Sequence, residues 1–502
     1  MARWALIPLS LLGACVCARW AEKLYGPKAG LLAAALWCFS PNLLAHGALI
    51  TPDAGATALG LTACYLFWRW LRGPSWRAAA LAGLALGVAE LTKSTWIVLF
   101  ALWPLLWPAY RWEGVVPRLR LPEGGQVLLV LSLGLFVLNL GYGFNGSFRR
   151  LRDYEFVSPT FTGSGEYRGI TGNRFRDSWL GGLPVPVPAN YLRGIDRQTW
   201  DFDHGMRSYL RGEWRHGGWW YYYLYALLIK VPLGTWALAV LALLARWTAR
   251  RPAASRWKDE MVLLAPALVV LVLVSSHTGF NHHLRYVLPA VPFALIWISQ
   301  LGEQCSFRQK PAASVLIASA LLWSIGSSLW ISPHSLSYFN ELAGGPTGGH
   351  AHLVNSNIDW GQDLLYLRDW LREHPEARPL GLAYFGHVDP RLAGIESTLP
   401  PPAPLSGVPV HPASDMTGPR PGWYAVSVSL LRGEVYSAPG PAGRRGIGGG
   451  DYTYFLHFQP VDRAGYSISI YHVTPVEAER VRREMAGERL NSTQHVKCTT
   501  TM

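Results

Sequence analysis

The sequence predicts a mainly α-helical, polytopic membrane protein: a bundle of about ten spans followed by a C-terminal α/β domain. Half of the 502 residues are hydrophobic and only 15% are charged, whereas a soluble globular domain carries about 25% charged residues. The mean hydropathy is +0.14. The 24 Trp and 22 Tyr residues suit a chain that crosses many lipid–water boundaries. An ordinary soluble enzyme is therefore excluded.

Long apolar stretches locate the spans, because a helix needs about 20 apolar residues to cross a bilayer. The candidates are 4–18, 29–46, 54–70, 78–91, 94–110, 126–144, 228–246, 260–276, 286–302 and 312–331. The fourth and fifth are short and are separated by the sequence Leu91-Thr92-Lys93, which predicts a tight turn at the membrane face.

Basic residues in the short connections predict the orientation of the spans. One side collects Arg19, Lys23, Lys28, Arg69, Arg72, Arg77, Arg111, Arg118, Arg120, Arg246, Arg250, Arg251, Arg256, Lys258, Arg308 and Lys310. The short loops of the other side hold only Lys93 and Arg285. The first side is therefore assigned to the cytoplasm, and the formal charge of +13 is explained by topology, without a nucleic-acid partner. An alternative for residues 1–18 is a signal peptide.

Two polar regions then fall on the extracytoplasmic side. Residues 1–331 form the predicted transmembrane domain, which includes an outer loop at 145–218 with little clear periodicity. Residues 332–502 form the predicted C-terminal α/β domain. Strands are expected at 380–385, 423–430, 452–458 and 466–473, with helices from about 359 to 372 and from Thr474 onward. Thr474 and Glu477 have the spacing of a capping box.

Ionisable groups at the outer face are the candidate site, because charge at a membrane boundary is costly unless it is paired or wetted. The expected group comprises His46, Asp53, Glu90, Lys93, His282, His283, Arg285 and Tyr286, with Lys230 near the same face. Several cations suit a phosphate leaving group, and a carboxylate suits a nucleophile that loses a proton.

Each of these residues also has a structural interpretation. Asp53 could cap a helix, Lys93 and Arg285 could extend to the membrane surface, and Glu90 could pair with Lys93. The two histidines at 282 and 283 could be solvated loop residues. Aromatic residues at 219–223 suit either the membrane interface or stacking on sugar rings. In the tail, Asp359 and Asp363 lie four apart, which suits helix capping better than a metal site.

Several motifs resemble the protein O-mannosyltransferase and aminoarabinose transferase superfamily of type C membrane glycosyltransferases. The strongest resemblance lies at 24–110, in LYGPK (24–28), SPNLLAHG (40–47), TPD (51–53), RWLRGPS (69–75), LAGLALG (81–87) and LTK (91–93). Further matches are NHHLRYVLP (281–289), YFNELAGGP (338–346) and NSNIDWGQDL (355–364), and the last two are similar to a bacterial branch.

The resemblance implies a glycosyltransferase, of hexosyl- or mannosyltransferase type, that takes a sugar from a polyprenyl phosphate on the extracytoplasmic face. It implies attack at the sugar C1 with inversion. Asp53 matches an acidic catalytic position, Arg285, Lys93 and His283 suit the donor phosphate, and His46, Glu90, His282 and Tyr286 line the pocket. The acceptor, a protein, lipid or glycan, is undetermined. The resemblance implies no definite cofactor, and it is compatible with a bound divalent metal ion. The expected location is a bacterial inner membrane with the C-terminal domain outside the cytoplasm.

The chain is also expected to differ from the family in one respect. In the family, the leading catalytic carboxylate lies in an outer loop after the first span. This chain is expected to begin at the family's second span, without that loop. The alternatives to a glycosyltransferase are therefore a carrier or flippase for a lipid-linked sugar and a non-catalytic membrane scaffold. A carrier needs charges at mid-membrane and paired interrupted helices, and the sequence has neither pattern.

Overall fold

The computed structural model describes residues 2–113, 116–117, 120–163, 171–248, 256–276, 279, 281–306, 308–404, 417–440 and 443–486. By contacts the chain divides into two compact units, one of residues 1–209 and 214–335, the other of 210–213 and 336–502. The division after Ser335 lies four residues from the predicted boundary at 331/332.

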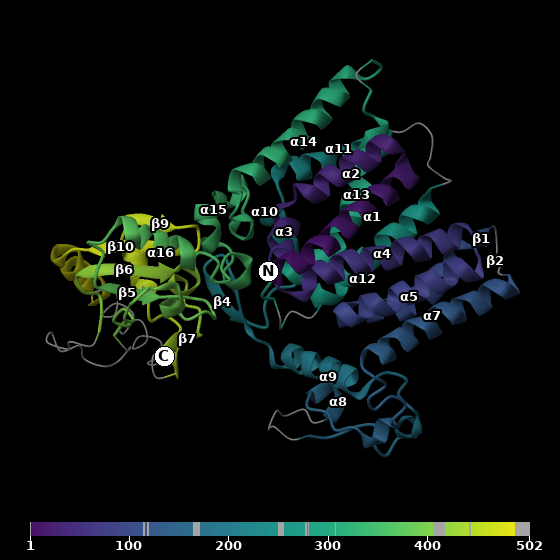
Figure 1. Ribbon diagram of the computed structural model, residues 1–502, viewed down its shortest axis with the longest axis horizontal. Helices are drawn as coiled ribbons and strands as arrows, with labels where there is room; N and C mark the ends of the chain where they lie inside the picture. The colour runs from purple at the N-terminus through teal and green to yellow at the C-terminus, as the bar shows by residue number, and fades with distance from the viewer. Residues whose placement is uncertain are drawn as a thin grey trace, which may run out of the picture. The chain divides into compact units, whose positions relative to one another are not determined.

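The first unit is helical (Figure 1). Its helices are α1 (Ile7–Tyr25), α2 (Pro27–Cys38), α3 (Pro41–Gly47), α4 (Pro52–Arg72), α5 (Trp76–Thr92), α6 (Val98–Tyr110), α7 (Leu121–Gly141), α8 (Pro159–Thr162), α9 (Ala189–His204), α10 (Tyr222–Lys230), α11 (Leu233–Thr248), α12 (Trp257–Ser276), α13 (Val291–Ile298) and α14 (Pro311–Ile331). Short 3-10 helices include η2 (Ser94–Ile97) and η6 (Leu284–Tyr286). Two short strand pairs lie outside the larger sheet: β1 (Trp112–Glu113) with β2 (Val116–Pro117), and β3 (Arg207–Leu210) with β4 (Glu213–His216). By contacts, residues 210–213 of the second pair belong to the second unit.

Among the described residues, four helices are long and apolar enough to cross a membrane: Trp4–Tyr25, Leu121–Gly141, Trp257–Ser276 and Pro311–Ile331. Two bent pairs raise the number to six if each is one span, α2 with α3 at 60° and α10 with α11 at 109°. These six correspond to six of the predicted spans. The other four fall on α4, α5, η2 with α6, and the region of α13, so the count of about ten stays a prediction.

Prolines begin many of these helices, because the missing N–H of proline costs nothing in a first turn. Pro27, Pro41 and Pro52 start α2, α3 and α4. Gly26 joins α1 to α2 with a φ of 91°, a conformation that glycine adopts without steric cost. The chain can therefore reverse between α1 and α2 within one residue.

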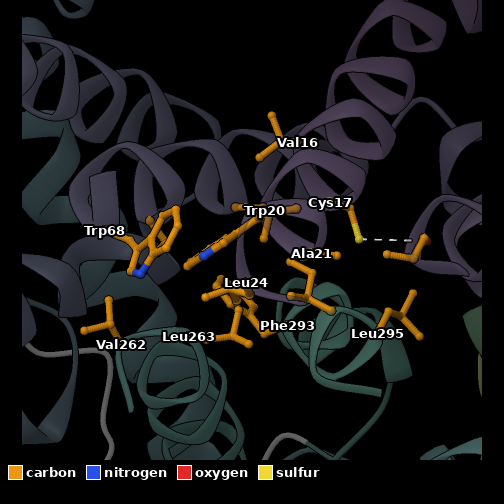
Figure 2. Close-up of a cluster of buried hydrophobic side chains, with 14 of the residues drawn as sticks. Val16, Cys17, Trp20, Ala21, Leu24, Trp68, Val262, Leu263, Phe293 and Leu295 are labelled. Atoms are coloured by element: carbon orange, nitrogen blue, oxygen red, sulfur yellow. Dashed lines mark hydrogen bonds between the residues drawn. The ribbon is translucent and has the colours of Figure 1, made fainter. Parts of the chain in front are cut away.

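Buried aliphatic and aromatic side chains of several helices pack together in the helical unit (Figure 2). The ring centroid of Trp20 lies 5.8 Å from that of Trp68 and 6.0 Å from that of Phe293, so α1, α4 and α13 meet there. Glycines allow closer approach elsewhere: a Cβ on Gly83 would lie 2.7 Å from the Val130 carbonyl oxygen, and one on Gly87 would lie 2.7 Å from that of Gly134. Small residues of this kind are typical of tight helix packing in membranes, and α4, α5 and α7 lie side by side (Figure 1).

Hydrogen bonds join the helix ends that carry the basic loops. Trp68 Nε1 and Tyr110 Oη both donate to Asp259 Oδ1 at 2.8 Å, and Arg246 pairs with Glu260 at 2.8 Å. The ends of α4, α6 and α11 and the start of α12 therefore meet at one end of the bundle. This agrees with the grouping of basic loops on one side.

The second unit is an α/β domain around a four-stranded sheet of order β5-β6-β10-β9. Its strands are β5 (Leu380–Ala383), β6 (Gly422–Ser427), β9 (Asp462–Ala464) and β10 (Ile468–Val473), and β7 (Tyr436–Gly440) pairs separately with β8 (Gly443–Ile447). Strand β5 is parallel to β6, and β10 is antiparallel to both β6 and β9. The helices are α15 (Gly345–Gly348), α16 (Leu364–Glu373) and α17 (Val428–Leu431).

Three of the four strands expected in this unit are present, and the fourth is wrong. Residues Thr453–His457 form a 3-10 helix, because Tyr454 and Phe455 stack on each other at 4.4 Å instead of alternating across a sheet. The predicted capping box is confirmed: Glu477 N donates to Thr474 Oγ1 at 3.3 Å, and Thr474 N donates to Glu477 Oε2 at 3.0 Å. Helix α16 begins at Leu364, later than predicted.

Candidate functional site

Asp53 lies at the end of α4, where its carboxylate is only 1% exposed. Thr51 is the N-cap residue and Pro52 the first helical residue, so the alternative in which Asp53 caps the helix is wrong. Asp53 nevertheless occupies the first turn, where the positive end of the helix dipole favours a negative charge.

Two cations contact the Asp53 carboxylate. Lys93 Nζ lies 2.8 Å from Oδ1, and Arg285 Nη1 lies 3.6 Å from Oδ2. Lys93 has an extended backbone between α5 and η2, as expected from the predicted turn at 91–93, and Arg285 belongs to η6. Neither side chain extends to the surface as an anchor. One carboxylate between two cations leaves the group with a net charge of about +1, which favours an anion.

Tyr286 lies between these cations. Its ring centroid is 5.2 Å from Lys93 Nζ and 5.4 Å from Arg285 Cζ, within the range of cation–π contacts. The His283 ring lies 5.5 Å from the same ring. Lys93, Arg285, Tyr286 and His283 are therefore neighbours, although they come from segments almost 200 residues apart.

The three histidines surround the same cluster. His46, in α3, is 4% exposed and interacts electrostatically with Asp53, Lys93, Arg285 and Lys230. The rings of His282 and His283 lie 5.5 Å apart. Burial lowers the pKa of the His282 imidazole to about 4, and burial together with Arg285 lowers the pKa of His283 well below its usual value. Both rings are therefore neutral near pH 7, and the positive charge at Asp53 comes from Lys93 and Arg285.

Glu90 does not pair with Lys93, as the alternative interpretation expected. Tyr191 Oη donates to Glu90 Oε2 at 2.6 Å, and Glu90 is 2% exposed. Lys93 instead forms an ion pair with Asp53. Helix α5 ends at Thr92, so the side chains of Glu90 and Lys93 point in different directions. Glu90 consequently links α5 to α9.

An apolar cavity of about 330 Å³ lies among α10, α11, α12 and α13, and some of its lining residues are close in sequence to the charged residues. Its wall includes Leu227 and Val231, which flank Lys230, and Val287, two residues after Arg285. Lys230 is itself buried, and its carbonyl accepts a hydrogen bond from Asn42 Nδ2 at 2.6 Å. The rest of the lining comes from α11, α12 and α13: Thr235, Trp236, Ala239, Leu264, Ala267, Leu268, Leu271, Ala290, Val291, Ala294, Leu295, Trp297 and Ile298.

Helix α9 is the part of the site that the sequence analysis missed. The loop 145–218 was expected to lack periodicity, yet Ala189–His204 is helical. The signal was present: Pro188 precedes Tyr191, Ile195, Gln198 and Phe202, and spacings of four, three and four mark one face of a helix. Tyr191 and Gln198 on this face contact α5 and η2.

Within the ranges that the structure covers, no three His, Cys, Asp or Glu residues lie together in a way that could hold a metal ion. In the second unit, Asp359 Oδ1 accepts a hydrogen bond from Gly361 N at 2.9 Å, and Asp363 Oδ2 accepts two from Tyr466 N and Ser467 N. Asp359 thus stabilises a turn before α16, and the interpretation in which it caps the helix is wrong.

Comparison with known proteins gives one family match. The model of the dolichyl-phosphate-mannose-protein mannosyltransferase family matches residues 1–134, the segment that contains Asp53 and Lys93. No curated protein matches the chain.

Two solved structures are similar to the chain, both of ArnT from Cupriavidus metallidurans. The structure bound to undecaprenyl phosphate is 15% identical, with 88% of this chain and 83% of that chain covered and a TM-score of 0.42. The apo structure is also 15% identical, with 67% of this chain and 55% of that chain covered and a TM-score of 0.37. In that comparison the chain spans about half the length of its relative. The family match at residues 1–134 confirms the predicted resemblance, and this part of the chain has the sequence pattern of the dolichyl-phosphate-mannose-protein mannosyltransferase family.

Proposed function

We propose that the protein is an integral membrane glycosyltransferase that moves a sugar from a polyprenyl phosphate to an acceptor on the extracytoplasmic face. One observation carries the proposal: Lys93 and Arg285 converge on the buried carboxylate of Asp53, and the lining of an apolar cavity includes Val287, two residues after Arg285. A lipid-linked phosphate needs both features, a cationic site for its head and an apolar surface for its chain.

The cations suit the departing phosphate. The acceptor's nucleophile attacks the sugar C1, and the bond between C1 and the phosphate oxygen breaks. The phosphate changes from a diester with one negative charge to a monoester with nearly two. Lys93 and Arg285 are held in place by Asp53 before the substrate arrives, so they can stabilise this developing charge without reorganising.

The remaining residues shape the pocket around the phosphate. His283 and His46, which are buried next to the cations, offer ring nitrogens as hydrogen-bonding groups, and Tyr286 holds Lys93 and Arg285 against its ring face. The prenyl chain would occupy the cavity between α10, α11, α12 and α13, where burial of each CH₂ group stabilises the complex by about 0.8 kcal/mol. His282 lies at the edge of the phosphate pocket. Glu90 contributes to the pocket indirectly, by holding α9 in place through Tyr191.

The proposed setting is a bacterial inner membrane, with the second unit outside the cytoplasm. The positive-inside distribution of Lys and Arg supports this orientation, since it assigns the Asp53 end of the bundle to the outer face. The acceptor is then a protein, lipid or glycan that reaches this face.

The test is sugar release by membranes that contain the protein, incubated with undecaprenyl phosphates carrying radiolabelled sugars. We expect wild type to move label from the lipid to endogenous acceptors and Asp53→Asn to lower the rate at least 100-fold, about 2.7 kcal/mol. Arg285→Ala should weaken undecaprenyl phosphate binding about 10- to 100-fold, because a charge-assisted contact is lost.

Arg256→Gln is the matched control, because Arg256 pairs with Glu303 at the other end of the bundle and its loss should leave transfer unchanged. A carrier would move the labelled lipid across the membrane with the sugar still attached. A scaffold would do neither. Full activity of Asp53→Asn would remove Asp53 from the mechanism.

A further inference from the structure

Helix α9 is fixed against the transmembrane helices along one face. Tyr191 Oη donates to Glu90 Oε2 at 2.6 Å, and Ser94 Oγ donates to Gln198 Oε1 at 3.2 Å. Tyr191 and Gln198 lie seven residues apart, two helical turns, so both contacts use the same face. Ser94 directly follows Lys93, so this part of α9 runs beside the charged cluster.

The C-terminal end of α9 is fixed to the segment that leads to Arg285. Met206 N donates to Gly279 O at 2.7 Å. A Cβ on Gly279 would lie 2.5 Å from the Phe202 carbonyl oxygen and 3.0 Å from Gly205 Cα, so the two backbones are in close contact. The last turn of α9 is thus packed against Gly279, six residues before Arg285.

Asp201 lies between these two attachments. It is three residues after Gln198 and therefore adjacent to it on the helix surface, and it precedes the Phe202–Gly205 contact. Its charge acts on Tyr286, the residue that lies between Lys93 and Arg285. Asp201 is half-buried, and within the described part of the chain no hydrogen bond or ion pair occupies its carboxylate.

The other two acidic residues of α9 point elsewhere. Asp196 accepts hydrogen bonds from Val157 N and Ser158 N, and Asp203 accepts from the Thr160 amide and hydroxyl. They are seven residues apart and share a face that packs on the outer loop. The plain alternative for Asp201 is a solvated helix residue, but its position between two attachments to the site distinguishes it from Asp196 and Asp203.

We propose that Asp201 is a second carboxylate of the transfer site and acts as the general base for the acceptor. This rests on the proposed function. As the acceptor oxygen or nitrogen bonds to the sugar C1, the C1–O bond to the phosphate breaks with its electron pair staying on the phosphate. The acceptor's proton passes to the Asp201 carboxylate, which becomes a neutral acid. Asp53 is unsuited to this step, because two cations already occupy its oxygens.

The test compares Asp201→Asn with Asp203→Asn in the labelled-sugar assay on membranes. We expect Asp201→Asn to lower kcat at least 100-fold, since general base catalysis contributes about 10²–10⁴. Its Kd for undecaprenyl phosphate should stay within about twofold of wild type, because the base contacts the acceptor and not the phosphate. Asp203→Asn should transfer sugar at the wild-type rate.

A pH profile separates catalysis from positioning. Asp201→Glu should restore part of the rate and keep the fall in rate at acid pH, where a carboxylate base is protonated. A merely structural role predicts instead that Asp201→Asn retains the wild-type pH profile. Wild-type transfer by Asp201→Asn would overturn the proposal.

A second measurement keeps this proposal distinct from the proposed function. If wild type releases no sugar from any labelled lipid, the glycosyltransferase function fails and the base role fails with it. Cross-linking of Asp201→Cys to Tyr286→Cys by a short bis-maleimide in membranes then tests the placement alone. Absence of the cross-link in protein that inserts into the membrane and resists unfolding as wild type does would contradict the position on which the proposal depends.

Discussion

Asp53 illustrates how a carboxylate is kept at the edge of a membrane. A buried charge is costly unless it is paired and hydrogen-bonded, and the two cations on Asp53, from Lys93 and Arg285, meet that requirement. Removing either cation leaves a buried charge that is only partly compensated, and such losses commonly destabilise by about 3–5 kcal/mol. Stability and donor binding must therefore be measured separately in variants of Lys93 and Arg285.

Asp359 in the second unit is a buried acid without a cation. Complete burial raises the pKa of its carboxyl well above the usual range, and the neighbouring Asp363 raises it further. Because the folded pKa exceeds the unfolded pKa, its contribution to stability is present at low pH and is lost as the pH rises through the folded pKa.

We expect Asp359→Asn to stabilise the protein at pH 7.5 by about 1 kcal/mol, or about 3 °C in Tm. Asparagine is neutral, can still accept from Gly361 N, and can donate to the Ser427 or Ser467 hydroxyl beside it. Thermal unfolding of the full chain in detergent at pH 7.5 and pH 4.5 checks this. The gain should shrink at the lower pH, and a gain that is equal at both pH values would contradict the protonation argument.

The sequence predicts which charged residues share an end of the bundle, but it does not predict their pairing. Asp53, Lys93 and Arg285 stand at the ends of apolar stretches on the same side, which is enough to bring them together. Glu90 stands only three residues from Lys93, and sequence distance favoured that pair. The choice depends on side-chain direction at the end of α5 and on Tyr191, whose helix the sequence analysis did not recognise.

Breaks in helices place several of the functional residues. The 60° bend between α2 and α3 and the 109° bend between α10 and α11 lie next to segments that carry His46 and Lys230. A helix that ends inside the bundle leaves backbone groups unsatisfied, and Asn42 Nδ2 satisfies one of them, the Lys230 carbonyl. The polar side chains at these breaks thus serve both the fold and the site.

Gly87→Val should disrupt the packing of α5 on α7. A Cβ at residue 87 would lie 2.5 Å from Val137 Cβ and 2.7 Å from the Gly134 carbonyl oxygen, so the two helices would have to separate. Overpacking of this kind costs about 1–3 kcal/mol or more. We expect a lower thermal aggregation temperature in detergent for Gly87→Val.

Gly326→Ala is the matched control, because a Cβ at residue 326 of α14 meets no atom within 4 Å. It should be neutral or slightly stabilising, since alanine favours helix more than glycine does. An unchanged aggregation temperature in Gly87→Val would show that α5 and α7 are less tightly packed than this contact implies.

Elements with a strong apolar pattern were predictable, and short or amphipathic ones were harder. The turn at 91–93 followed from the two short apolar runs, and the Thr474 helix followed from its capping box. Residues 453–457 have the aromatic content of a strand, yet ring stacking makes them a 3-10 helix. Helix α9 has a clear period at Tyr191, Ile195, Gln198 and Phe202, but the glycines and prolines around it concealed the pattern.

At the scale of the whole molecule, the helical unit has two chemically different ends. One end gathers Asp259 and Glu260 with Trp68, Tyr110 and Arg246. The other gathers Asp53 with Lys93 and Arg285. The distribution of basic loops predicts that the Asp259 end faces the cytoplasm and the Asp53 end the exterior.

Labelling from one side of the membrane tests this orientation. Arg77 and Arg193 are exposed and belong to opposite ends, since Arg77 follows the start of α5 and Arg193 lies in α9. We expect Arg193→Cys in intact cells to react with a membrane-impermeant maleimide and Arg77→Cys to react only after the membrane is opened. Reaction above the wild-type background is the measure, because the chain has six native cysteines. The reverse pattern would place the site in the cytoplasm.

The number of spans depends on more than apolar length. The four single helices that are long and apolar enough to cross a membrane are also the spans that are easiest to recognise from the sequence. Helix α5 has 17 residues and α13 has eight, and both are packed among longer neighbours that can shield their ends. Apolar length predicts a membrane protein well, whereas its exact number of crossings also depends on this packing.

Because Asp53 pairs with both Lys93 and Arg285, the proposed function has a consequence for the rate of turnover. An arriving phosphate competes with the carboxylate for the same two cations. The spent lipid carrier, with nearly two charges, competes better than the loaded carrier with one. Rebinding of the spent carrier would then inhibit the cycle, and any neighbouring reaction that consumes free prenyl phosphate would relieve this inhibition.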